Sequence, residues 1–287
     1  MKLLIFGYGY SARYLVAELA ATPGSVRVTT RSPDKAAQAA AEGLTPRIFP
    51  GTDMADDIAW ASHILITAGP EDGQDPVLAH AREAIAAHAK RLDWVGYLST
   101  TGVYGDHGGA WVDEATPLTP STERGRARVA AEAAWMELYH QHGLPLHIFR
   151  LAGIYGPGRG PFEKVRDGTA RRIIKPDQVF SRIHVADIAQ VLIASMARPD
   201  PGAAYNLCDD DPAPPQDVIA YAATLLGLPE PPAIPFDQAS LSPMAASFYA
   251  ESKRVDNRRI KADLGVRLRY PDYRTGLAAL LKQERER

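Results

Sequence analysis

The chain has 287 residues and a mass of 31.1 kDa, enough to bury a large core as one α/β unit or as a nucleotide-binding domain with a smaller lobe. Its formal net charge of -2 gives no broad attraction to nucleic acid or anionic membranes, and we expect the basic residues near 166–172 and 253–259 to form solvated faces. The sequence contains no run of about 18 apolar residues, the length that could span a membrane. The first apolar run breaks too early for a secretory leader. We therefore expect a cytoplasmic protein whose partner is a small molecule, with no nucleic-acid or membrane partner, no metal site, and Cys208 as a small buried core residue.

Short, nearly continuous apolar segments alternate with helical patterns through the first half of the chain. Such segments are typical of parallel strands that are covered on both faces. We predict strands at residues 3–6, 26–29, 64–67, 95–98 and 146–149, with a further strand ahead of Gly51. This alternation predicts an α/β fold with a Rossmann-type, doubly wound parallel sheet.

Two helices follow from local signals. The first has small and apolar residues at the spacing of one buried stripe, namely Ala12, Leu15, Val16, Leu19 and Ala20. The second is expected to begin at Pro33, because Ser32 can cap it and proline suits the first helical position, and to end at Gly43.

The pattern of alternating apolar and helical segments ends at about residue 153. Residues 156–161 have loop chemistry, and Pro-rich segments at 211–215 and 229–235 separate further short elements. We predict a Rossmann domain of residues 1–153 with about 183–207, and a smaller C-terminal α/β substrate lobe of about 154–182 and 208–287.

A glycine-rich turn follows the first predicted strand. Residues 7–12 fit Gly-x-Gly-x-x-Ala, in which Gly7 permits the tight turn, Gly9 lets the backbone approach a pyrophosphate and Ala12 allows close helix–strand packing. The helix N-terminus supplies aligned N–H donors for the anion, and Tyr10 and Ser11 lie in its first turn. This context predicts a dinucleotide site, with a purely structural glycine turn as the alternative.

The end of the second predicted strand bears on the choice of nucleotide. An NAD site usually carries Asp or Glu there to accept from the ribose hydroxyls, whereas this chain has Thr30, Arg31 and Ser32. Arg31 can pair with a 2′-phosphate in fork geometry, Ser32 can donate to it, and Lys35 is close enough to add charge. NADP(H) is therefore favoured over NAD(H), and a solvated Arg31 is the alternative.

Two further loops are expected to face the nucleotide. Asp53, after the third strand, could hydrogen-bond the adenine amine. Ala68, Gly69 and Pro70, after the fourth strand, are small enough to let the dinucleotide pass. Each loop is explained equally well as an ordinary turn.

Several motifs in the same order resemble the extended short-chain dehydrogenases/reductases, the group that includes NAD-dependent nucleotide-sugar epimerases and dehydratases. Residues 98–105 resemble the fifth-strand motif that carries the catalytic Ser or Thr, which falls on Thr100. Residues 150–157 resemble the sixth-strand Arg-x-x-x-x-Tyr-Gly-Pro, residues 182–189 the Ile-His-Val-x-Asp-Ile-Ala segment, and residues 205–207 the strand that begins the C-terminal lobe. The resemblance runs over nearly the whole length.

The expected chemistry departs from that family. There, a Tyr-x-x-x-Lys pair on the helix after the fifth strand transfers the proton, and the lysine holds the nicotinamide ribose. In this chain the tyrosine position is Arg124 and the lysine position is Arg128. Arg128 could still bind ribose hydroxyls, but the Arg124 guanidinium stays protonated and is no practical acid–base catalyst. The phosphate loop also lacks the usual Gly-x-x-Gly-x-x-Gly spacing, and both departures resemble the atypical branch of the family.

Other candidates for proton chemistry have simpler explanations. Tyr104 follows Thr100 at the strand end, and Glu123 lies beside Arg124. Core packing explains Tyr104, and capping at a helix start explains Glu123. His184, also at an expected helix start, is interpreted as structural.

A second Tyr-x-x-x-Lys does occur, at Tyr249 and Lys253. It lies in the second lobe, far along the chain from the strand that it should follow. We therefore set it aside as a coincidence of spacing.

The sequence favours an NADP(H)-binding oxidoreductase or epimerase-like enzyme that acts on a small carbonyl or nucleotide-sugar-type substrate without the usual Tyr-x-x-x-Lys pair. Thr100 and Arg124 would polarise the substrate while a water or substrate group handles the proton, and Tyr104 is a further catalytic candidate. A catalytically silent NADP(H) sensor is the rival hypothesis. Ala-rich helices near 76–91 and 121–141 predict a homodimer, because the corresponding helices often pair in the family the chain resembles.

Overall fold

The computed structural model describes residues 1–19 and 24–286, so Ala20 of the predicted first-helix stripe lies outside the described residues. The strands are β1 (Leu3–Phe6), β2 (Val26–Thr30), β3 (Thr45–Ile48), β4 (His63–Ile66), β5 (Trp94–Thr100), β6 (Trp111–Val112), β7 (Leu146–Leu151), β8 (Gly153–Tyr155), β9 (Arg172–Ile174), β10 (Arg182–His184), β11 (Ala204–Leu207), β12 (Ala233–Pro235) and β13 (Arg254–Val255). The α-helices are α1 (Tyr10–Glu18), α2 (Pro33–Ala41), α3 (Ala55–Trp60), α4 (Pro76–His88), α5 (Glu123–His142), α6 (Phe162–Arg166), α7 (Val185–Ala197), α8 (Pro215–Leu226), α9 (Pro243–Tyr249), α10 (Arg258–Leu264) and α11 (Tyr273–Arg285). Short 3₁₀ turns are η1 (Ala89–Arg91), η2 (Thr101–Tyr104) and η3 (Phe236–Gln238).

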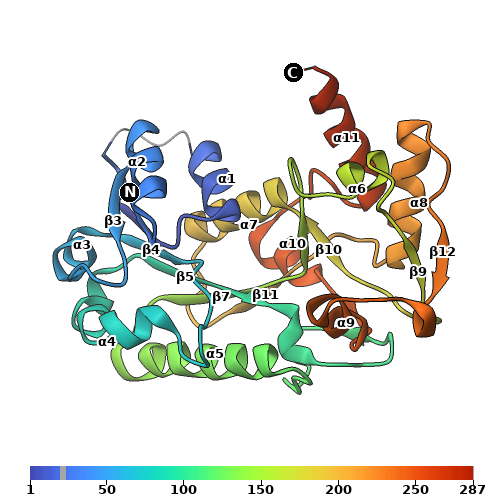
Figure 1. Cartoon of the computed structure of the whole chain (residues 1–287). Helices are drawn as coiled ribbons and strands as arrows, with labels where there is room; N and C mark the ends of the chain where they lie inside the picture. The colour runs from blue at the N-terminus through green and yellow to red at the C-terminus, as the bar shows by residue number, and fades with distance from the viewer. Residues whose placement is uncertain (20–23, 287) are drawn as a thin grey trace.

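Seven parallel strands form the central sheet in the order β11-β7-β5-β4-β1-β2-β3 (Figure 1). The chain builds outward from β1 to β3, crosses back to β4, and continues outward to β11. Strands β1 and β4 are therefore neighbours at the point where the strand order reverses, which is where open α/β sheets bind ligands beyond the strand C-termini. The predicted doubly wound parallel sheet is confirmed, and each predicted strand is present.

Both faces of the sheet are covered, because successive side chains of a strand point to opposite sides. In β1, Leu3 and Ile5 pack with residues of α1 and α7, whereas Leu4 and Phe6 pack with residues of α3, α4 and α5. Figure 1 shows the same layers, with α1 and α7 above the sheet and α4 and α5 below it. Because mostly apolar side chains fill both faces, a ligand site is expected at the ends of the strands.

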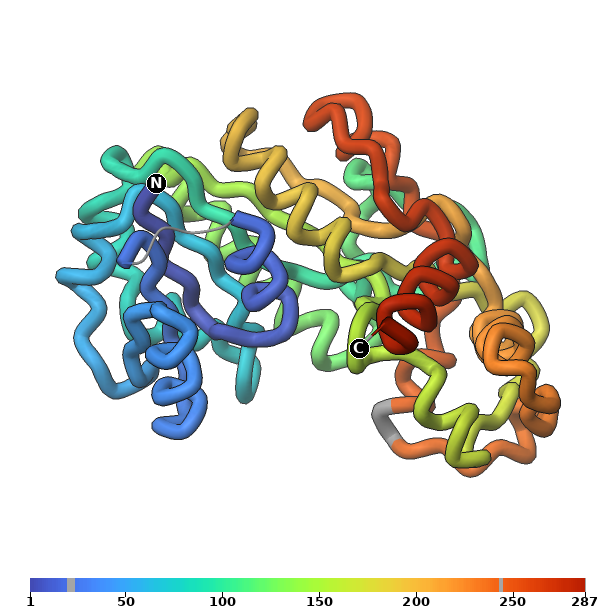
Figure 2. Tube along the Cα trace, turned by 90° about the horizontal axis from the view of Figure 1, so that it is seen from above, coloured from blue at the N-terminus to red at the C-terminus, as the bar shows by residue number. Residues whose placement is uncertain are grey.

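A separate apolar core lies at the other end of the molecule. It joins α6, α8 and α11 through buried residues that include Phe162, Val218 and Leu277. These helices lie to the right of the N-terminal strands in Figure 1, and Figure 2 shows the same separation from above. Helix α10 lies between α8 and α11 in the chain but does not join their core. Its residues Ile260 and Leu264 pack into the core around α7 and β11. The C-terminal part therefore is not one separate unit, since it returns to the central sheet at α10.

Cys208 has the core position that the sequence predicts. Cys208 is fully buried, and its Sγ donates to the Val255 carbonyl, which confirms the expected core placement. Burial raises the pKa of the Cys208 thiol well above its usual value, so a reactive thiolate is disfavoured.

Across residues 1–19 and 24–286, no helix has the length and apolar character needed to cross a bilayer.

The residue after Cys208 makes stability depend on pH. Asp209 is 1% exposed, its Oδ1 accepts from the Asp211 N–H, and its Oδ2 has no hydrogen-bond partner among the described residues. Burial raises the pKa of the Asp209 carboxyl to about 8, against the opposing charge of Arg182. The folded-state pKa lies above that of an unfolded aspartate. The group's contribution to stability is therefore fully present below the ordinary aspartate pKa and is lost as the pH rises through about 8.

Asp209→Asn should therefore stabilise the protein only at high pH. The amide keeps an acceptor for the Asp211 N–H and removes the buried charge. In urea denaturation we expect a higher midpoint than wild type at about pH 9 and little difference at about pH 4. The exposed Asp237→Asn is the matched control; equal changes in the two variants would contradict this account of Asp209.

Candidate functional site

Two threonines hold the glycine-rich loop between β1 and α1. The Gly7 N–H donates to Thr29 Oγ1 at 2.9 Å, and Thr67 Oγ1 donates to the Gly7 carbonyl. Gly7 has a φ of 95°, and a Cβ there would lie 2.8 Å from Thr67 Oγ1, so only glycine fits. The two hydroxyls come from β2 and from the end of β4, so both neighbours of β1 fix the loop. The sequence does not single out either threonine, because threonine in a strand is ordinary.

Gly9 has a different role from Gly7. It is the N-cap of α1 with a φ of -99°, and a Cβ there would meet nothing within 4 Å. Packing therefore does not demand glycine, whereas close approach of a ligand to the backbone does. Without a side chain, Gly9 cannot accept from the first-turn N–H groups of α1, which are left to bind an anion. By contrast, α2, α4 and α5 have side-chain caps from Ser32, Asp75 and Thr122.

The first turn of α1 contacts both parts of the molecule. Ala12 is fully buried in the core around β1, as close helix–strand packing requires, and Ser11 is nearly buried. Tyr10 points toward the loop after β8, where its hydroxyl donates to the Pro157 carbonyl at 3.0 Å. The Arg159 guanidinium lies 5.6 Å from the Tyr10 ring centroid. The loop after β8 is thus packed against the phosphate loop.

Arg31 follows β2 and forms an ion pair that could not be predicted from the sequence. Its Nη1 donates to both carboxylate oxygens of Glu71, at 2.8 and 2.7 Å. Glu71 follows β4, two strands away from β2 in the sheet. Within the described parts of the chain, Nε and Nη2 of Arg31 have no hydrogen-bond partner, so that edge of the guanidinium remains open to a phosphate.

Ser32 and Lys35 lie beside Arg31 at the start of α2. The Ser32 hydroxyl accepts from the Lys35 N–H at 3.4 Å and so caps the helix, as the sequence predicts. The hydroxyl hydrogen of Ser32 is still available for donation. The Lys35 side chain is exposed, so its ammonium can move toward a phosphate without losing a buried contact.

The two other expected nucleotide loops differ in character. Asp53 is exposed, and its Oδ1 accepts from the Ala55 N–H at 3.0 Å, as in an ordinary turn before a helix. Ala68, Gly69 and Pro70 are partly buried beyond β4. A Cβ at Gly69 would lie 2.2 Å from the guanidinium of an arginine from α5, so a larger residue there would require that side chain to move.

That arginine is Arg128, which the sequence resemblance assigns to the position of the usual lysine. Its Nη1 donates to the Leu98 carbonyl of β5 at 2.6 Å and to the Tyr97 hydroxyl at 3.3 Å. Its other terminal nitrogen is the atom nearest to Gly69. Arg128 therefore places a permanent positive charge between the ends of β4 and β5.

The start of α5, which carries Arg124, packs against the turn that directly follows Thr100. Gly125 allows the close approach, because a Cβ there would lie 2.9 Å from the Gly102 carbonyl in η2, the turn that directly follows Thr100. Thr100 Oγ1 accepts from the Gly102 N–H at 3.2 Å and keeps its own hydrogen for donation. Arg124 is exposed, and it has no hydrogen-bond or ion-pair partner within residues 1–19 and 24–286.

Tyr104 does not face this group, which corrects its inclusion among the catalytic candidates. It is fully buried, its hydroxyl donates to Asn206 Oδ1 at 2.7 Å, and it accepts from Arg150 Nη1 at 2.9 Å. Burial raises the pKa of the Tyr104 phenol to about 12. The η2 turn directs Tyr104 into the core, so it cannot touch a substrate in this conformation.

A buried ion pair supports the site from behind. Arg150 of β7 donates to Glu132 of α5 through Nη2 at 2.8 Å, and Ser99 Oγ donates to the same carboxylate. Glu132 lies one helical turn after Arg128, so the pair fixes the face of α5 that carries the site arginines. Sequence reasoning missed this pair. The signal available was a glutamate within the otherwise apolar, core-facing stripe of an Ala-rich helix.

His184 and Glu123 have the places that the sequence suggests. His184 is the N-cap of α7, and its Nδ1 accepts from the Ala186 N–H at 3.2 Å, which confirms a structural role. Burial lowers the pKa of His184 to about 4. Glu123 lies in the first turn of α5, although Thr122 supplies the cap.

The second Tyr-x-x-x-Lys segment is closer in space than its place in the chain suggests. Lys253 Nζ donates to the Gly105 carbonyl at 2.7 Å and to Glu251 Oε2 at 2.6 Å, and Ser121 Oγ donates to Glu251. The segment therefore lies against the turn after β5 and the start of α5. Lys253 is only 8% exposed, so the expected solvated face is wrong at this residue, and its ammonium anchors the segment.

Comparisons with known proteins agree with this architecture. The family model described as "NAD dependent epimerase/dehydratase family" matches residues 73–208. "Protein YeeZ" of Escherichia coli K12 is 31% identical over 288 residues, covering 94% of this chain and 97% of that protein. The structure of a functionally unknown conserved protein from Silicibacter pomeroyi DSS is 60% identical, with a TM-score of 0.90 and 98% of both chains covered. The UDP-glucuronic acid 4-epimerase from Bacillus cereus, in complex with NAD, shares the fold at 16% identity, with a TM-score of 0.74 over 99% of both chains.

The identity to YeeZ extends over nearly the full length of both proteins, and the matched family model spans the segment from the turn before α4 to the end of β11. The strand order and the glycine-rich loop at its reversal point are those of a dinucleotide-binding fold. The chain therefore belongs to the NAD-dependent epimerase/dehydratase family of extended short-chain dehydrogenases/reductases.

Proposed function

We propose that the protein is an NADP(H)-dependent oxidoreductase or epimerase-like enzyme that acts on a small carbonyl or nucleotide-sugar-type substrate. The observation that supports this most is the common location of three groups. The glycine-rich loop follows β1, Arg31 follows β2, and Thr100 ends β5, where Arg128 of α5 donates to the Leu98 carbonyl. Because these strands are parallel members of one sheet, their C-termini lie at the same edge. The second lobe, about 154–182 and 208–287 apart from α10, would cover the substrate. The NAD complex of a UDP-glucuronic acid 4-epimerase with this fold agrees with a nicotinamide dinucleotide here.

The residues present fit such a nucleotide. The uncapped first turn of α1 and the open side of Gly9 suit a pyrophosphate. Arg31, Ser32 and Lys35 suit a 2′-phosphate, and Arg128 suits the hydroxyls of the second ribose. When bound, the nicotinamide supplies or accepts the hydride.

The chain's own residues would orient the substrate and polarise its carbonyl. The Thr100 hydroxyl has a hydrogen to donate, because its acceptor side already takes the Gly102 N–H. Arg124 adds a positive charge where negative charge develops on oxygen. Arg124 cannot supply the proton, since a guanidinium stays protonated near neutral pH, so water or a substrate hydroxyl must carry it.

Thr100→Val should test whether the site is catalytic. Loss of one positioned donor should lower the turnover number roughly ten-fold or more, while the affinity for NADPH changes little. The assay is NADPH consumption against a panel of carbonyl compounds and nucleotide sugars. Thr224→Val, an exposed substitution on α8, is the matched control. Unchanged turnover in Thr100→Val would contradict a catalytic role for this hydroxyl.

Restoring the usual pair with Arg124→Tyr and Arg128→Lys tests the proton route. If Thr100 and Arg124 polarise the substrate, the double change should lower the natural activity. A wild-type pH–rate profile governed by a tyrosine, and lost in Tyr249→Phe, would instead assign the proton to the second Tyr-x-x-x-Lys segment. That result would overturn the route through water or substrate.

The second candidate is a catalytically silent NADP(H) sensor, and the assignment of Arg124 to the tyrosine position favours it. A sensor would bind NADPH without consuming it across the whole substrate panel. Its NADPH affinity would also survive both Thr100→Val and the double change at Arg124 and Arg128.

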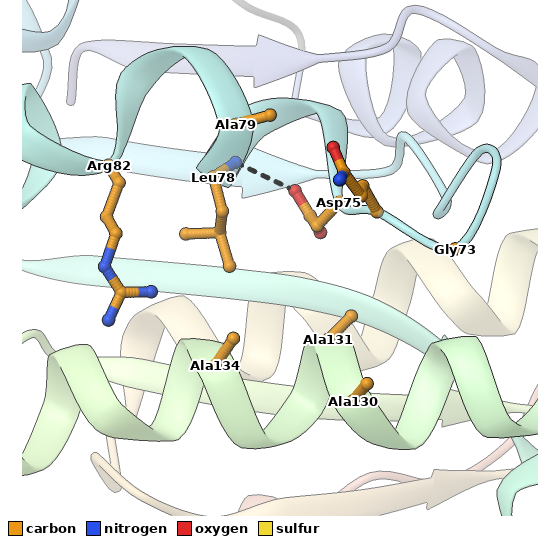
Figure 3. A pocket seen from close by; sticks show the side chains of 9 residues that line it. Gly73, Asp75, Leu78, Ala79, Arg82, Ala130, Ala131 and Ala134 are labelled. Carbon is orange, nitrogen blue, oxygen red and sulfur yellow. Dashed lines mark hydrogen bonds between the residues drawn. The ribbon is translucent and has the colours of Figure 1, made fainter.

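We propose that the protein is a homodimer that pairs through α4 and α5. Between these helices lies a surface cavity of about 310 Å³, lined mostly by small or apolar side chains that include Leu78, Ala79, Ala130 and Ala134 (Figure 3). Such a surface allows helices of a second copy to approach closely. Light scattering at micromolar concentration should give about twice 31.1 kDa, and Ala130→Arg should shift the protein to a monomer. A wild-type mass of one chain would contradict the dimer.

A further inference from the structure

The ion pair between Arg31 and Glu71 spans the two loops on either side of the glycine-rich loop. Arg31 follows β2 and Glu71 follows β4, and both strands are hydrogen-bonded neighbours of β1. Strands in a sheet lie about 4.8 Å apart, so β2 and β4 are about 10 Å apart, a distance that an arginine and a glutamate side chain can bridge together. The pair therefore crosses the sheet edge beyond β1, beside the proposed adenosine half of the nucleotide.

The backbone around Glu71 is firmly built. Glu71 and Gln74 exchange two backbone hydrogen bonds, at 2.9 and 3.0 Å. The residues between them, Asp72 and Gly73, have φ values of 49° and 78°, the arrangement of a two-residue turn with both central residues left-handed. Asp75 then caps α4 and accepts from Trp135 Nε1 at 3.0 Å. Glu71 thus projects from an anchored turn.

We propose that Glu71 is a specificity-determining residue, whose carboxylate competes with the nucleotide 2′-phosphate for the Arg31 guanidinium. This inference rests on the proposed function, because it places the adenosine ribose beside Arg31. Glu71 already uses both of its oxygens on Nη1, and a 2′-phosphate brought to the same guanidinium would be repelled by that carboxylate. The two side chains are 72% and 60% exposed, so the pair is weak, and a phosphate at the free Nε–Nη2 edge would draw the guanidinium away from Glu71.

The same carboxylate has the opposite effect on a nucleotide without the 2′-phosphate. A ribose 2′-hydroxyl can donate to Glu71, as it does to the acid at the end of β2 in NAD sites. Glu71 would therefore supply from the β4 loop the acceptor that β2 lacks. Arg31 favours NADP(H), Glu71 favours NAD(H), and the balance between them sets the selectivity.

Glu71→Gln tests this without relying on catalysis. The probes are 2′,5′-ADP and 5′-AMP, measured by calorimetric titration of the full chain. Removing the charge should raise the affinity ratio of 2′,5′-ADP to 5′-AMP about three- to ten-fold, the scale expected for one exposed charge beside a phosphate. An unchanged ratio would overturn the inference. A lower ratio would also overturn it, because Glu71 would then be orienting Arg31 for the phosphate.

Asp72→Asn is the matched control. It removes the same charge one residue away in the same turn, and asparagine tolerates the positive φ of that position. A through-space effect of net charge would change the ratio equally in Asp72→Asn and Glu71→Gln, and that outcome would overturn direct competition for Arg31.

Arg31→Ala separates this inference from the nucleotide choice on which it rests. If Arg31→Ala leaves the 2′,5′-ADP to 5′-AMP ratio at the wild-type value, the NADP(H) proposal itself is wrong. If Arg31→Ala abolishes the preference while Glu71→Gln changes nothing, only the inference about Glu71 is wrong. On the Arg31→Ala background, Glu71→Gln should have no larger effect than Asp72→Asn.

Discussion

Glu132→Ala should lower the free energy of unfolding by about 3–5 kcal/mol, because it leaves a buried arginine without its counter-charge. The Arg150 and Glu132 side chains are 7% and 4% exposed, and they contact each other through three hydrogen bonds of 2.8 to 3.3 Å. After the substitution, Arg150 keeps only the Tyr104 hydroxyl as a partner among the described residues. Urea denaturation followed by circular dichroism measures the loss.

Glu137→Ala is the matched control on the same helix. Glu137 pairs with Arg82 at 2.7 Å, but the two side chains are 58% and 36% exposed, so its removal should cost about 1 kcal/mol or less. Replacing both partners of the buried pair, with Glu132→Leu and Arg150→Met, should recover much of the stability. An equal loss in Glu132→Ala and Glu137→Ala would show that the buried pair does not support α5.

Arg31→Ala should weaken NADPH binding by about 1.5–3 kcal/mol, the scale of hydrogen bonds to a charged group. The variant removes the guanidinium whose free edge is expected to meet the 2′-phosphate. NADH has no such phosphate, so its affinity should change much less. Calorimetric titration of both nucleotides measures the difference.

Arg82→Ala controls for removal of a surface arginine. Arg82 also pairs with a glutamate at 2.7 Å, but it lies on α4 below the sheet and away from the nucleotide site. It should leave both affinities unchanged. If Arg31→Ala weakened NADPH and NADH equally, Arg31 would be a general phosphate or structural contact and would not select NADP(H).

The sheet could be predicted because its strands carry local signals. Central strands such as β1 and β4 are buried on both faces and have nearly continuous apolar runs, LLIF and HILI. The residues of the edge strand β3 (Thr45–Ile48) are only partly buried, so the strand does not need an apolar run and has none. It was predicted only because a strand was expected ahead of Gly51. Strands of two residues, such as β6 and β13, carry too little pattern to be recognised.

The parts of the site that were missed join segments far apart in the chain. The glycine-rich loop could be recognised because its residues are consecutive and directly follow a strand. The contacts of Thr29 and Thr67 with Gly7, and of Arg31 with Glu71, exist only because the sheet brings different strand ends together. No local pattern encodes those contacts.

The sequence also did not show in which direction the side chains of the site point. Thr100 and Tyr104 belong to one short motif, yet Thr100 lies at the open end of β5 and Tyr104 points into the core. The 3₁₀ turn between them decides the direction, and its geometry depends on the packing of Gly125 against Gly102. A motif identifies which residues are present, but packing decides which of them reach a substrate.

The most direct test of the account is a side-by-side titration of the wild-type protein with NADPH and NADH under the same salt and pH. We predict that NADPH binds more tightly, because Arg31 occupies the place of the ribose-binding acid and keeps an edge free for the 2′-phosphate. Equal affinity for the two nucleotides, or tighter binding of NADH, would contradict it.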